Sequence, residues 1–216
     1  MQTPRFFWLG LALLLFVHMG WASGLPLRIT VLGDSLTAGY GLAAREAFPA
    51  QLERALQKAG YRVLVQNAGV SGDTSAGGLA RLDWSLAARP DLMIVELGAN
   101  DALRGLDPEL THKNLDAILT RLKAAGVPAL LTGMKAPRNL GPDYYTKFDR
   151  LYPELAERHA VPFYPFFLEG VAGRAELNQA DGLHPNTKGV ALIVGKMLPL
   201  IAEQLKRLNL RGASLK

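Results

Sequence analysis

Residues 27–36 read Leu-Arg-Ile-Thr-Val-Leu-Gly-Asp-Ser-Leu, and this stretch decides the fold class. Its first six residues are mostly apolar and rich in β-branched side chains, which is typical of a buried strand. The strand ends at Gly33, and the next helix is expected over residues 46–59, where apolar side chains recur at helical spacing. That helix accepts Pro49 in its first turn and stops at Gly60. A buried strand followed by a helix predicts the first unit of an α/β fold.

The rest of the chain repeats this alternation of strand and helix signals. Further strands are expected at residues 62–66, 91–97, 127–132 and 161–164. Further helices are expected at residues 75–88, 108–125, 144–159 and 187–208. Ser75 is expected to cap the first of these helices and Pro199 to bend the last. The alternation predicts a three-layer α/β/α sandwich with a central, mainly parallel five-stranded sheet.

The composition is that of one globular domain. The 216 residues are 49% hydrophobic and 20% charged, which excludes disordered and fibrous proteins. The chain has no cysteine, which excludes a disulfide scaffold, a zinc ribbon and a thiol nucleophile, so any nucleophile is oxygen or nitrogen. The formal charge of +5 comes from scattered basic residues interleaved with acidic ones. We therefore expect no nucleic-acid partner.

The first part of the chain has the pattern of a secretory signal peptide. Arg5 supplies a positive start, residues 6–17 are almost unbroken apolar sequence, and small residues flank Trp21. These small residues favour cleavage after Ala22, with Gly24 as the alternative. An uncleaved membrane anchor is disfavoured, because the apolar run is shorter than the ~20 residues of a spanning helix. Removing 22 of 216 residues leaves one domain of 194 residues, 23–216. We expect this domain to be periplasmic, with secretion as the alternative. We also expect it to be a monomer without stable membrane insertion.

Four polar clusters follow predicted strands or the loop after the last one. Ligands of parallel sheets bind beyond the carboxyl ends of the strands, so these clusters are expected to converge at one edge of the sheet. They are Gly33-Asp34-Ser35-Leu36, Asn67-Ala68-Gly69-Val70-Ser71-Gly72-Asp73, Gly98-Ala99-Asn100-Asp101 and Asp181-Gly182-Leu183-His184-Pro185.

The clusters contain a hydroxyl nucleophile and a matching base. Ser35 lies in a glycine-flanked turn, and its hydroxyl needs a base within hydrogen-bond reach. His184 is the best candidate, because Asp181 three residues earlier can reach its Nδ1–H within one turn and fix its tautomer. The other histidines lie in the predicted signal peptide or on charged helices, where solvated positions are expected: His18, His112 and His159.

Acyl transfer also needs hydrogen-bond donors for the developing oxyanion. Ser35 N–H, Gly69 N–H and the Asn100 side-chain amide are the candidates. Each feature alone has an ordinary structural reading, as a helix cap, a turn or an Asx turn, and Asp-x-x-His is also a common structural turn or metal pair. Their joint placement after successive strands favours the catalytic interpretation.

In this order and at these spacings, the four clusters resemble the four sequence blocks of the GDSL, or SGNH, serine hydrolases. The resemblance spans Leu27 to about Gly189. Three longer phrases resemble the periplasmic bacterial group of multifunctional acyl-CoA thioesterase, lysophospholipase and arylesterase. They are Gly-Asp-Ser-Leu-Thr-Ala-Gly-Tyr-Gly, Val-Glu-Leu-Gly-Ala-Asn-Asp-Ala-Leu-Arg-Gly and Tyr-Pro-Phe-Phe-Leu-Glu-Gly. Ala99 stands where many relatives have a second glycine, and its methyl group could narrow the pocket.

The resemblance implies a flavodoxin-like fold. It also implies an enzyme that hydrolyses arylesters, acyl-CoA thioesters and lysophospholipids through an acyl-enzyme, without a metal or organic cofactor. By this resemblance Ser35 is the nucleophile, His184 is the general base and Asp181 is the carboxylate that orients the base. Gly69 and Asn100 are the second and third oxyanion donors. The first oxyanion donor is the N–H of the nucleophile itself. Asp34 is expected to stabilise the turn rather than to act in catalysis.

Acyl specificity is less clearly encoded. Six residues in or beside the loops after the third and fourth strands could line an apolar groove: Leu103, Leu106, Ala136, Pro137, Leu140 and Tyr145. Four of these are the predicted substrate-binding residues: Leu103, Leu106, Pro137 and Leu140. The alternative is that all six simply anchor loops.

Two other functions remain open from the sequence. A carbohydrate or cell-wall O-acetyl esterase on the same fold would need exposed aromatic platforms near Ser35. Trp84 has helical spacing with Leu79 and Leu82, which predicts packing and gives this alternative little support. A binding module without activity is disfavoured, because the nucleophile, base, orienting carboxylate and oxyanion donors are all present.

Overall fold

The computed structural model describes residues 25–214, so the predicted signal peptide lies outside the described residues. All five strands of the sheet pair in parallel. They are β1 (Leu27–Gly33), β2 (Val63–Gly69), β3 (Leu92–Glu96), β4 (Ala129–Thr132) and β5 (Phe163–Tyr164). Their order across the sheet is β2-β1-β3-β4-β5. The predicted parallel five-stranded sheet is confirmed.

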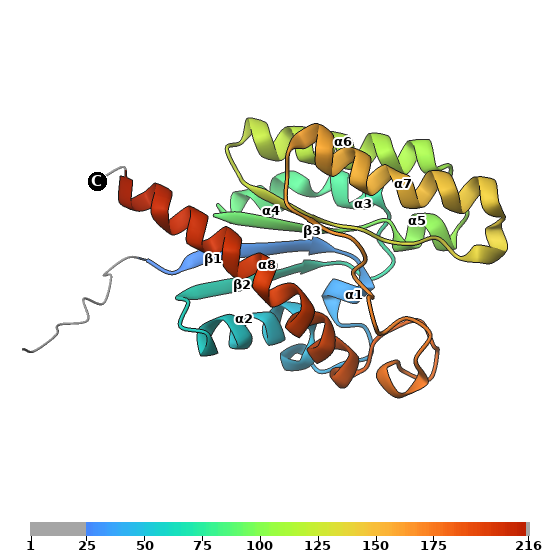
Figure 1. The fold of residues 1–216 in the computed structure, drawn as a ribbon, viewed down its shortest axis with the longest axis horizontal. Coiled ribbons are helices and arrows are strands. Elements are labelled where there is room, and N and C mark those ends of the chain that lie inside the picture. Colours follow the sequence, from blue (N-terminus) through green and yellow to red (C-terminus); the bar gives the residue numbers. More distant parts are fainter. Residues whose placement is uncertain (1–24, 215–216) are drawn as a thin grey trace, which may run out of the picture.

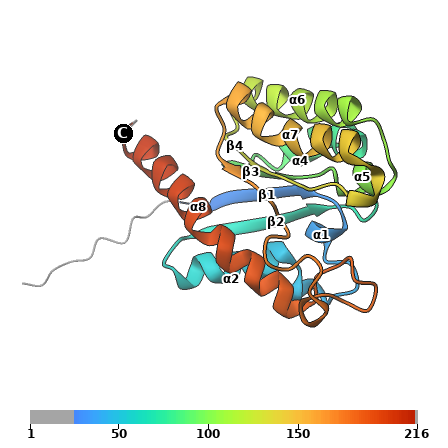
Figure 2. The same cartoon turned by 45° about the vertical axis from the view of Figure 1, so that its right-hand side comes forward.

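Helices cover both faces of the sheet (Figures 1 and 2). On one face, α2 (Phe48–Lys58) packs against α8 (Thr187–Ser214). The opposite face carries α3 (Ser75–Ala80), α4 (Leu82–Ala87), α6 (Pro108–Ala124) and α7 (Pro142–His159). The short elements are α1 (Ser35–Ala38), α5 (Ala99–Leu103) and the 3-10 turns η1 (Ala44–Glu46), η2 (Arg138–Leu140) and η3 (Ala175–Leu177). The predicted three-layer α/β/α sandwich is therefore correct, and no helix within residues 25–214 is long and apolar enough to cross a membrane.

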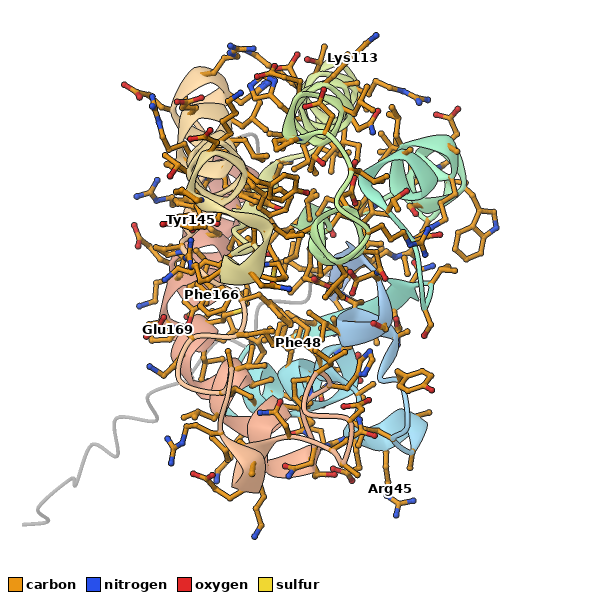
Figure 3. The ribbon with its side chains drawn as sticks, turned by 90° about the vertical axis from the view of Figure 1, so that its right-hand side faces the viewer. Arg45, Phe48, Lys113, Tyr145, Phe166 and Glu169 are labelled. Atoms are coloured by element: carbon orange, nitrogen blue, oxygen red, sulfur yellow. The ribbon has the colours of Figure 1, made fainter. Side chains whose placement is uncertain are left out.

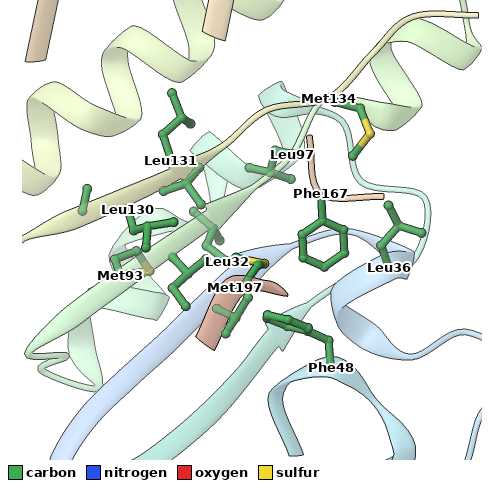
Figure 4. Packing of buried hydrophobic residues seen from close by; sticks show 14 of the residues in the cluster. Leu32, Leu36, Phe48, Met93, Leu97, Leu130, Leu131, Met134, Phe167 and Met197 are labelled. Carbon is green, nitrogen blue, oxygen red and sulfur yellow. The ribbon is translucent and has the colours of Figure 1, made fainter. Parts of the chain in front are cut away.

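The apolar core lies on both sides of the central strands. On the α2–α8 side, Phe48 meets Phe167 edge to face, with ring centroids 5.0 Å apart, and Met197 of α8 lies beside them (Figure 4). Leu32 of β1 and Met93 of β3 are fully buried in the same core. The runs predicted as buried strands are buried because helices close both faces of the sheet.

The predicted helix over residues 75–88 is wrong as a continuous element. It breaks into α3 and α4 at Arg81, whose backbone (φ −105°, ψ 11°) departs from helical geometry. Ser75 does not cap α3. The cap is Thr74, whose side chain accepts from Gly77 N–H, while the Ser75 hydroxyl is buried and donates to Asp101. The last helix continues through Pro199 to Ser214, beyond the predicted end.

The strand order explains where a site can form. The chain leaves β1 towards β2 on one side and later returns to β3 on the other side, so the loops after β1 and β3 diverge at the carboxyl edge. Figure 3 looks onto this edge, with Arg45 and Lys113 at opposite ends of the molecule and Phe48 between them. The polar clusters after β1, β2 and β3 therefore belong to one edge, as the sequence predicts.

Candidate active site

A tight turn between β1 and α1 presents Ser35. Asp34 caps α1, and its Oδ1 accepts the Leu36 N–H at 3.0 Å. Gly33 is required here, because a Cβ atom at this position would lie 2.1 Å from Thr37 Oγ1. The helix ends after one turn at Gly39, which has a left-handed backbone (φ 82°). The nucleophile candidate is thus the first residue of a short helix directly after a buried strand, and the prediction of Asp34 as a turn-stabilising residue is consistent with its bonds.

The loop before α8 brings His184 to Ser35. His184 Nε2 lies 2.9 Å from Ser35 Oγ, and His184 Nδ1 lies 2.7 Å from Asp181 Oδ2. The other oxygen of Asp181 accepts the backbone N–H groups of Leu183 at 2.9 Å and of His184 at 3.0 Å. The three side chains that the sequence analysis selected therefore form one continuous hydrogen-bonded row.

The hydrogen bonds to Asp181 fix its charge. The backbone N–H of His184, followed by its imidazole, lowers the pKa of the Asp181 carboxyl from 3.8 to about 2. The ionised carboxylate can only accept, so the proton of a neutral imidazole lies on Nδ1 and leaves Nε2 free to accept from the Ser35 hydroxyl. This arrangement can take the proton from Ser35 as its oxygen attacks an electrophile.

Two further residues hold the imidazole in place. The Tyr40 ring lies against the His184 ring, with centroids 4.6 Å apart and a tilt of 37°. Gln179 Nε2 donates to the carbonyl groups of Tyr40 at 2.7 Å and Pro185 at 3.0 Å, and its backbone N–H donates to His184 O at 2.7 Å. The loop after α1 and the loop that carries His184 are thus tied together, which limits rotation of the base.

The predicted oxyanion donors belong to the last residue of β2 (Gly69), to α5 (Asn100) and to the first residue of α1 (Ser35), and two of them already have acceptors. Asn100 Nδ2 donates to Asp34 Oδ2 at 3.1 Å and to Asp73 O at 2.9 Å. Gly69 N–H donates to Asn67 Oδ1 at 2.9 Å. An oxyanion would share these donors or replace one of their acceptors. Ser35 N–H belongs to the first residue of α1, where N–H groups have no acceptor within the helix.

Two buried carboxyl groups lie behind Ser35. Asp34 and Glu96 are both fully buried, and Glu96 Oε2 accepts from Thr37 Oγ1 at 2.8 Å and from Asp34 N–H at 3.4 Å. Glu96 Oε1 has no hydrogen-bond partner among the described residues. Burial raises the pKa of Asp34 from 3.8 to about 6. Burial, together with the charge of Asp34, raises the pKa of Glu96 well above 4.5. Burial therefore favours the neutral form of the Glu96 carboxyl beneath the turn.

Glu96→Gln should make the protein less sensitive to rising pH. In the wild type, Glu96 of the unfolded chain ionises near pH 4.5, whereas the folded side chain ionises only at a higher pH, so stability falls as pH rises from 4.5 towards the raised pKa of Glu96. The glutamine variant lacks this loss. Its melting temperature relative to wild type should rise by about 3–6 °C per pH unit between pH 4.5 and the raised pKa of Glu96, from ~1.4 kcal/mol per unit. Thermal unfolding between pH 4.5 and 8.5 measures this slope.

Glu157→Gln is the matched control, because Glu157 is exposed on α7. Its melting temperature should follow the wild type at every pH. A constant difference between Glu96→Gln and wild type across the pH range would show that Glu96 is ionised in the folded protein.

The predicted substrate-binding residues lie at the same end of the molecule. Leu103 and Leu106 are exposed on and after α5, and Leu140 is exposed on η2. Tyr144 OH donates to Leu106 O at 2.7 Å, which ties the loop before α6 to the start of α7. Pro137 is half-buried. The structure thus brings two apolar loops together beside the carboxyl edge.

Ala136 does not belong to this surface. It is buried in the core, and its N–H donates to Asp149 Oδ1 at 2.9 Å. Tyr145 is half-buried, with the Arg138 guanidinium 4.4 Å from its ring centroid. A surface groove at the amino ends of β3 and β4, which Leu92 and Ala129 help to line, lies at the opposite edge of the sheet from Ser35.

Two other expectations fail. Trp84 is not a packing residue, because 65% of it is exposed on α4. His159 is not a solvated surface residue: only 10% of its side chain is exposed, and its Nε2 lies 2.9 Å from Asp116 Oδ1. Helical spacing led to the wrong prediction for Trp84, and charged neighbours led to the wrong prediction for His159. His112 is half-buried. Within residues 25–214, no group of three or more histidine, aspartate or glutamate side chains is arranged to hold a metal ion.

Three neighbours of the site were not predicted from the sequence: Glu96, Thr37 and Arg81. Glu96 was included in a strand, although a lone carboxyl within the apolar run Leu-Met-Ile-Val-Glu-Leu is a detectable signal of a special role. Arg81 was hidden within a predicted helix. No local pattern could have shown that its side chain turns towards the sheet.

Comparisons with known proteins agree with this architecture. The sequence profile of the GDSL-like Lipase/Acylhydrolase family matches residues 31–192. The chain is 44% identical over 158 residues to Esterase TesA of Pseudomonas aeruginosa, which covers 73% of this chain and 79% of the relative. It is 42% identical over 181 residues to Thioesterase 1/protease 1/lysophospholipase L1 of Escherichia coli, covering 83% and 84%.

The fold is also found among solved structures. The psychrotrophic esterase EstA from Pseudoalteromonas sp., in a structure inhibited by monoethylphosphonate, superimposes with a TM-score of 0.78 at 35% identity. The superposition covers 83% of this chain and 98% of EstA. The resemblance seen in the four polar clusters is therefore confirmed, and the chain belongs to the GDSL-like lipase/acylhydrolase family.

Proposed function

We propose that the protein hydrolyses carboxylic ester and thioester bonds of acyl substrates through an acyl-enzyme on Ser35. The observation that carries this proposal is the continuous row from Ser35 Oγ through His184 to Asp181, with separations of 2.9 and 2.7 Å. The relatives named esterase, thioesterase and lysophospholipase support the same reaction class. Arylesters, acyl-CoA thioesters and lysophospholipids are the proposed substrate classes.

The mechanism follows from the row of hydrogen bonds. Ser35 Oγ attacks the carbonyl carbon while its proton passes to His184 Nε2, and the carbonyl oxygen becomes an oxyanion. The imidazolium, stabilised by the Asp181 carboxylate, then gives this proton to the departing alcohol or thiol as the bond to carbon breaks. Water attacks the acyl-enzyme in the same way, with His184 taking its proton and returning it to Ser35 as the carboxylic acid leaves.

The oxyanion needs donors at this edge of the sheet. We propose Ser35 N–H, Gly69 N–H and the Asn100 amide for this role. Asn100 is held by Asp34, and a Cβ atom on Gly69 would lie 2.3 Å from Ala38 N, so Gly69 is pressed against the nucleophile turn. Positioned donors of this kind typically contribute 10² to 10³ to the rate, that is, on the order of 3–4 kcal/mol each.

The acyl chain is proposed to lie along the apolar loops that carry Leu103, Leu106, Pro137 and Leu140. Leu103 and Leu106 follow Asn100 closely in sequence and are 53% and 37% exposed. Covering such surface with an alkyl chain is favourable by about 25 cal/mol per Å² of apolar area. This preference would distinguish longer acyl chains from acetyl.

kcat/KM for p-nitrophenyl esters should therefore rise with acyl length from acetyl to octanoyl. Leu106→Ser should lower the value for the octanoyl ester by about 3- to 10-fold, from the loss of part of one leucine contact, and leave the acetyl ester nearly unchanged. Steady-state kinetics with the purified domain 23–216 and a C2 to C8 ester series measure both effects.

Leu64→Ser is the control, because Leu64 is similarly exposed but lies near the amino end of β2. It should change neither ester. A sharp optimum at acetyl in the wild type would refute the acyl groove and favour the second candidate, an O-acetyl esterase acting on carbohydrate or cell-wall polymers. Exposed Tyr40, whose ring lies against that of His184, is the observation that favours this second candidate.

The cellular setting is also part of the proposal. We propose a signal peptide over residues 1–22 and a single exported domain over residues 23–216, periplasmic or secreted, that acts as a monomer on a small acyl substrate without nucleic acid. The apolar run of residues 6–17 and the small residues that flank Trp21 support the export signal.

A further inference from the structure

Arg81, at the break between α3 and α4, makes three hydrogen bonds that reach into two other parts of the chain. Its Nε donates to Asp73 Oδ2 at 2.6 Å, its Nη1 to Ala68 O at 2.6 Å and its Nη2 to Gly33 O at 2.8 Å. Its side chain and that of Asp73 are each only 19% exposed. A planar guanidinium presents its donors in a fixed fork, so these three acceptors are held in one arrangement.

Two of the acceptors are directly linked to a proposed oxyanion donor, and the third lies in the segment that leads to Ser35. Ala68 C=O and Gly69 N–H belong to the same peptide group, so the bond from Arg81 orients this group and polarises its N–H. The Asp73 side chain bonds Arg81, while the Asp73 carbonyl accepts from Asn100 Nδ2 at 2.9 Å. Gly33 O ends the strand two residues before Ser35. One guanidinium therefore connects the chain segments of all three donors.

The surrounding packing leaves this assembly little freedom. A Cβ atom on Gly77 would lie 2.7 Å from Asp73 Oδ1, so the carboxylate is seated against α3. Gly69 is pressed from the other side by the turn around Ala38. Rigid donors are what oxyanion stabilisation requires, because donors that need no reorganisation contribute most in the transition state.

We infer that Arg81 is a positioning residue for the oxyanion hole. It aligns and polarises the Ala68–Gly69 peptide and fixes the Asp73 backbone against which the Asn100 amide is held. This inference rests on the proposed ester hydrolysis and adds a residue that does not itself touch the substrate. If Arg81 and Asp73 formed only a structural ion pair, replacing Arg81 would lower stability without weakening the binding of an oxyanion.

The test compares Arg81→Met and Arg81→Lys with the wild type. Arg81→Met should lower kcat for p-nitrophenyl butyrate by about 10- to 100-fold, less than the 10² to 10³ expected for direct loss of a donor in Asn100→Ala. KM should stay within about threefold. The inhibition constant of an alkyl trifluoromethyl ketone, which forms an oxyanion when Ser35 adds to it, should rise by the same factor as kcat falls. Arg81→Lys keeps the positive charge, so its kcat should fall less than that of Arg81→Met.

Combination with Asn100→Ala tests whether both residues act through one site. The double variant Arg81→Met/Asn100→Ala should lose clearly less than the product of the single losses, because both substitutions damage the same oxyanion hole. Arg121→Met is the matched control, since Arg121 pairs with Asp83 of α4 at an exposed position. It should leave kcat and the inhibition constant unchanged.

Three outcomes overturn the inference: a lower melting temperature with unchanged kcat, an unchanged ketone inhibition constant, or multiplicative losses in the double variant. If Arg81→Met does not fold, an unchanged kcat in folded Arg81→Lys would also overturn the inference. Failure of the proposed function is separate, since then the wild type itself would not hydrolyse the ester.

Discussion

Ser35→Ala is expected to lower kcat/KM for p-nitrophenyl butyrate by about 10³- to 10⁶-fold, since removal of a nucleophile leaves only binding and oxyanion stabilisation. Ser35 Oγ is the only atom of Ser35 that bonds the His184 ring, at 2.9 Å. The substitution removes one oxygen from the half-buried first residue of α1 and leaves the caps of that helix, Asp34 and Gly39, unchanged. The melting temperature should therefore stay close to that of the wild type.

Labelling by a fluorophosphonate probe gives an independent measurement. The probe phosphorus should bond to Ser35 Oγ with loss of fluoride, so the wild type becomes labelled and Ser35→Ala does not. The phosphonate-inhibited structure of EstA supports the choice of probe. Ser71→Ala, in the exposed loop after β2, is the control and should be both active and labelled. Full activity in folded Ser35→Ala would exclude Ser35 as the nucleophile.

The parts of the fold with a local signal were predictable from the sequence. The strands predicted at residues 27–32 and 91–97 match β1 and β3 to within one residue at each end, because burial on both faces demands a continuous apolar run. The break at Arg81 was not predictable. It depends on carbonyl acceptors 13 and 48 residues earlier in the chain, which no helical periodicity contains.

The site shows the same division. Asp181 and His184 are three residues apart, so one turn closes their bond and spacing alone predicts it. The bond between Ser35 and His184 joins residues 149 positions apart, and their meeting was predicted by the rule that ligands bind at the carboxyl edge of a parallel sheet, together with the family resemblance. Glu96 was missed because its raised pKa depends on burial and on the charge of Asp34, 62 residues away.

His184→Ala should have an effect as large as that of Ser35→Ala, lowering kcat/KM by about 10³- to 10⁶-fold, because Ser35 then has no base and the leaving group no acid. Asp181 cannot replace it. The backbone N–H groups of residues 183 and 184, which help to lower the pKa of Asp181, remain in this variant, so the carboxylate stays a weak base. Steady-state kinetics at pH 7 and at pH 9 check this result, and the higher pH should restore only a small part of the rate.

The double variant Ser35→Ala/His184→Ala separates a catalytic unit from two unrelated losses. If the two side chains act on one proton, removing the second after the first costs almost nothing, and the double variant keeps the residual rate of either single variant. If they act independently, the two losses multiply. His112→Ala, on α6, is the control for loss of an imidazole and should be fully active. Multiplicative losses would contradict a shared proton, even though Ser35 Oγ and His184 Nε2 lie 2.9 Å apart.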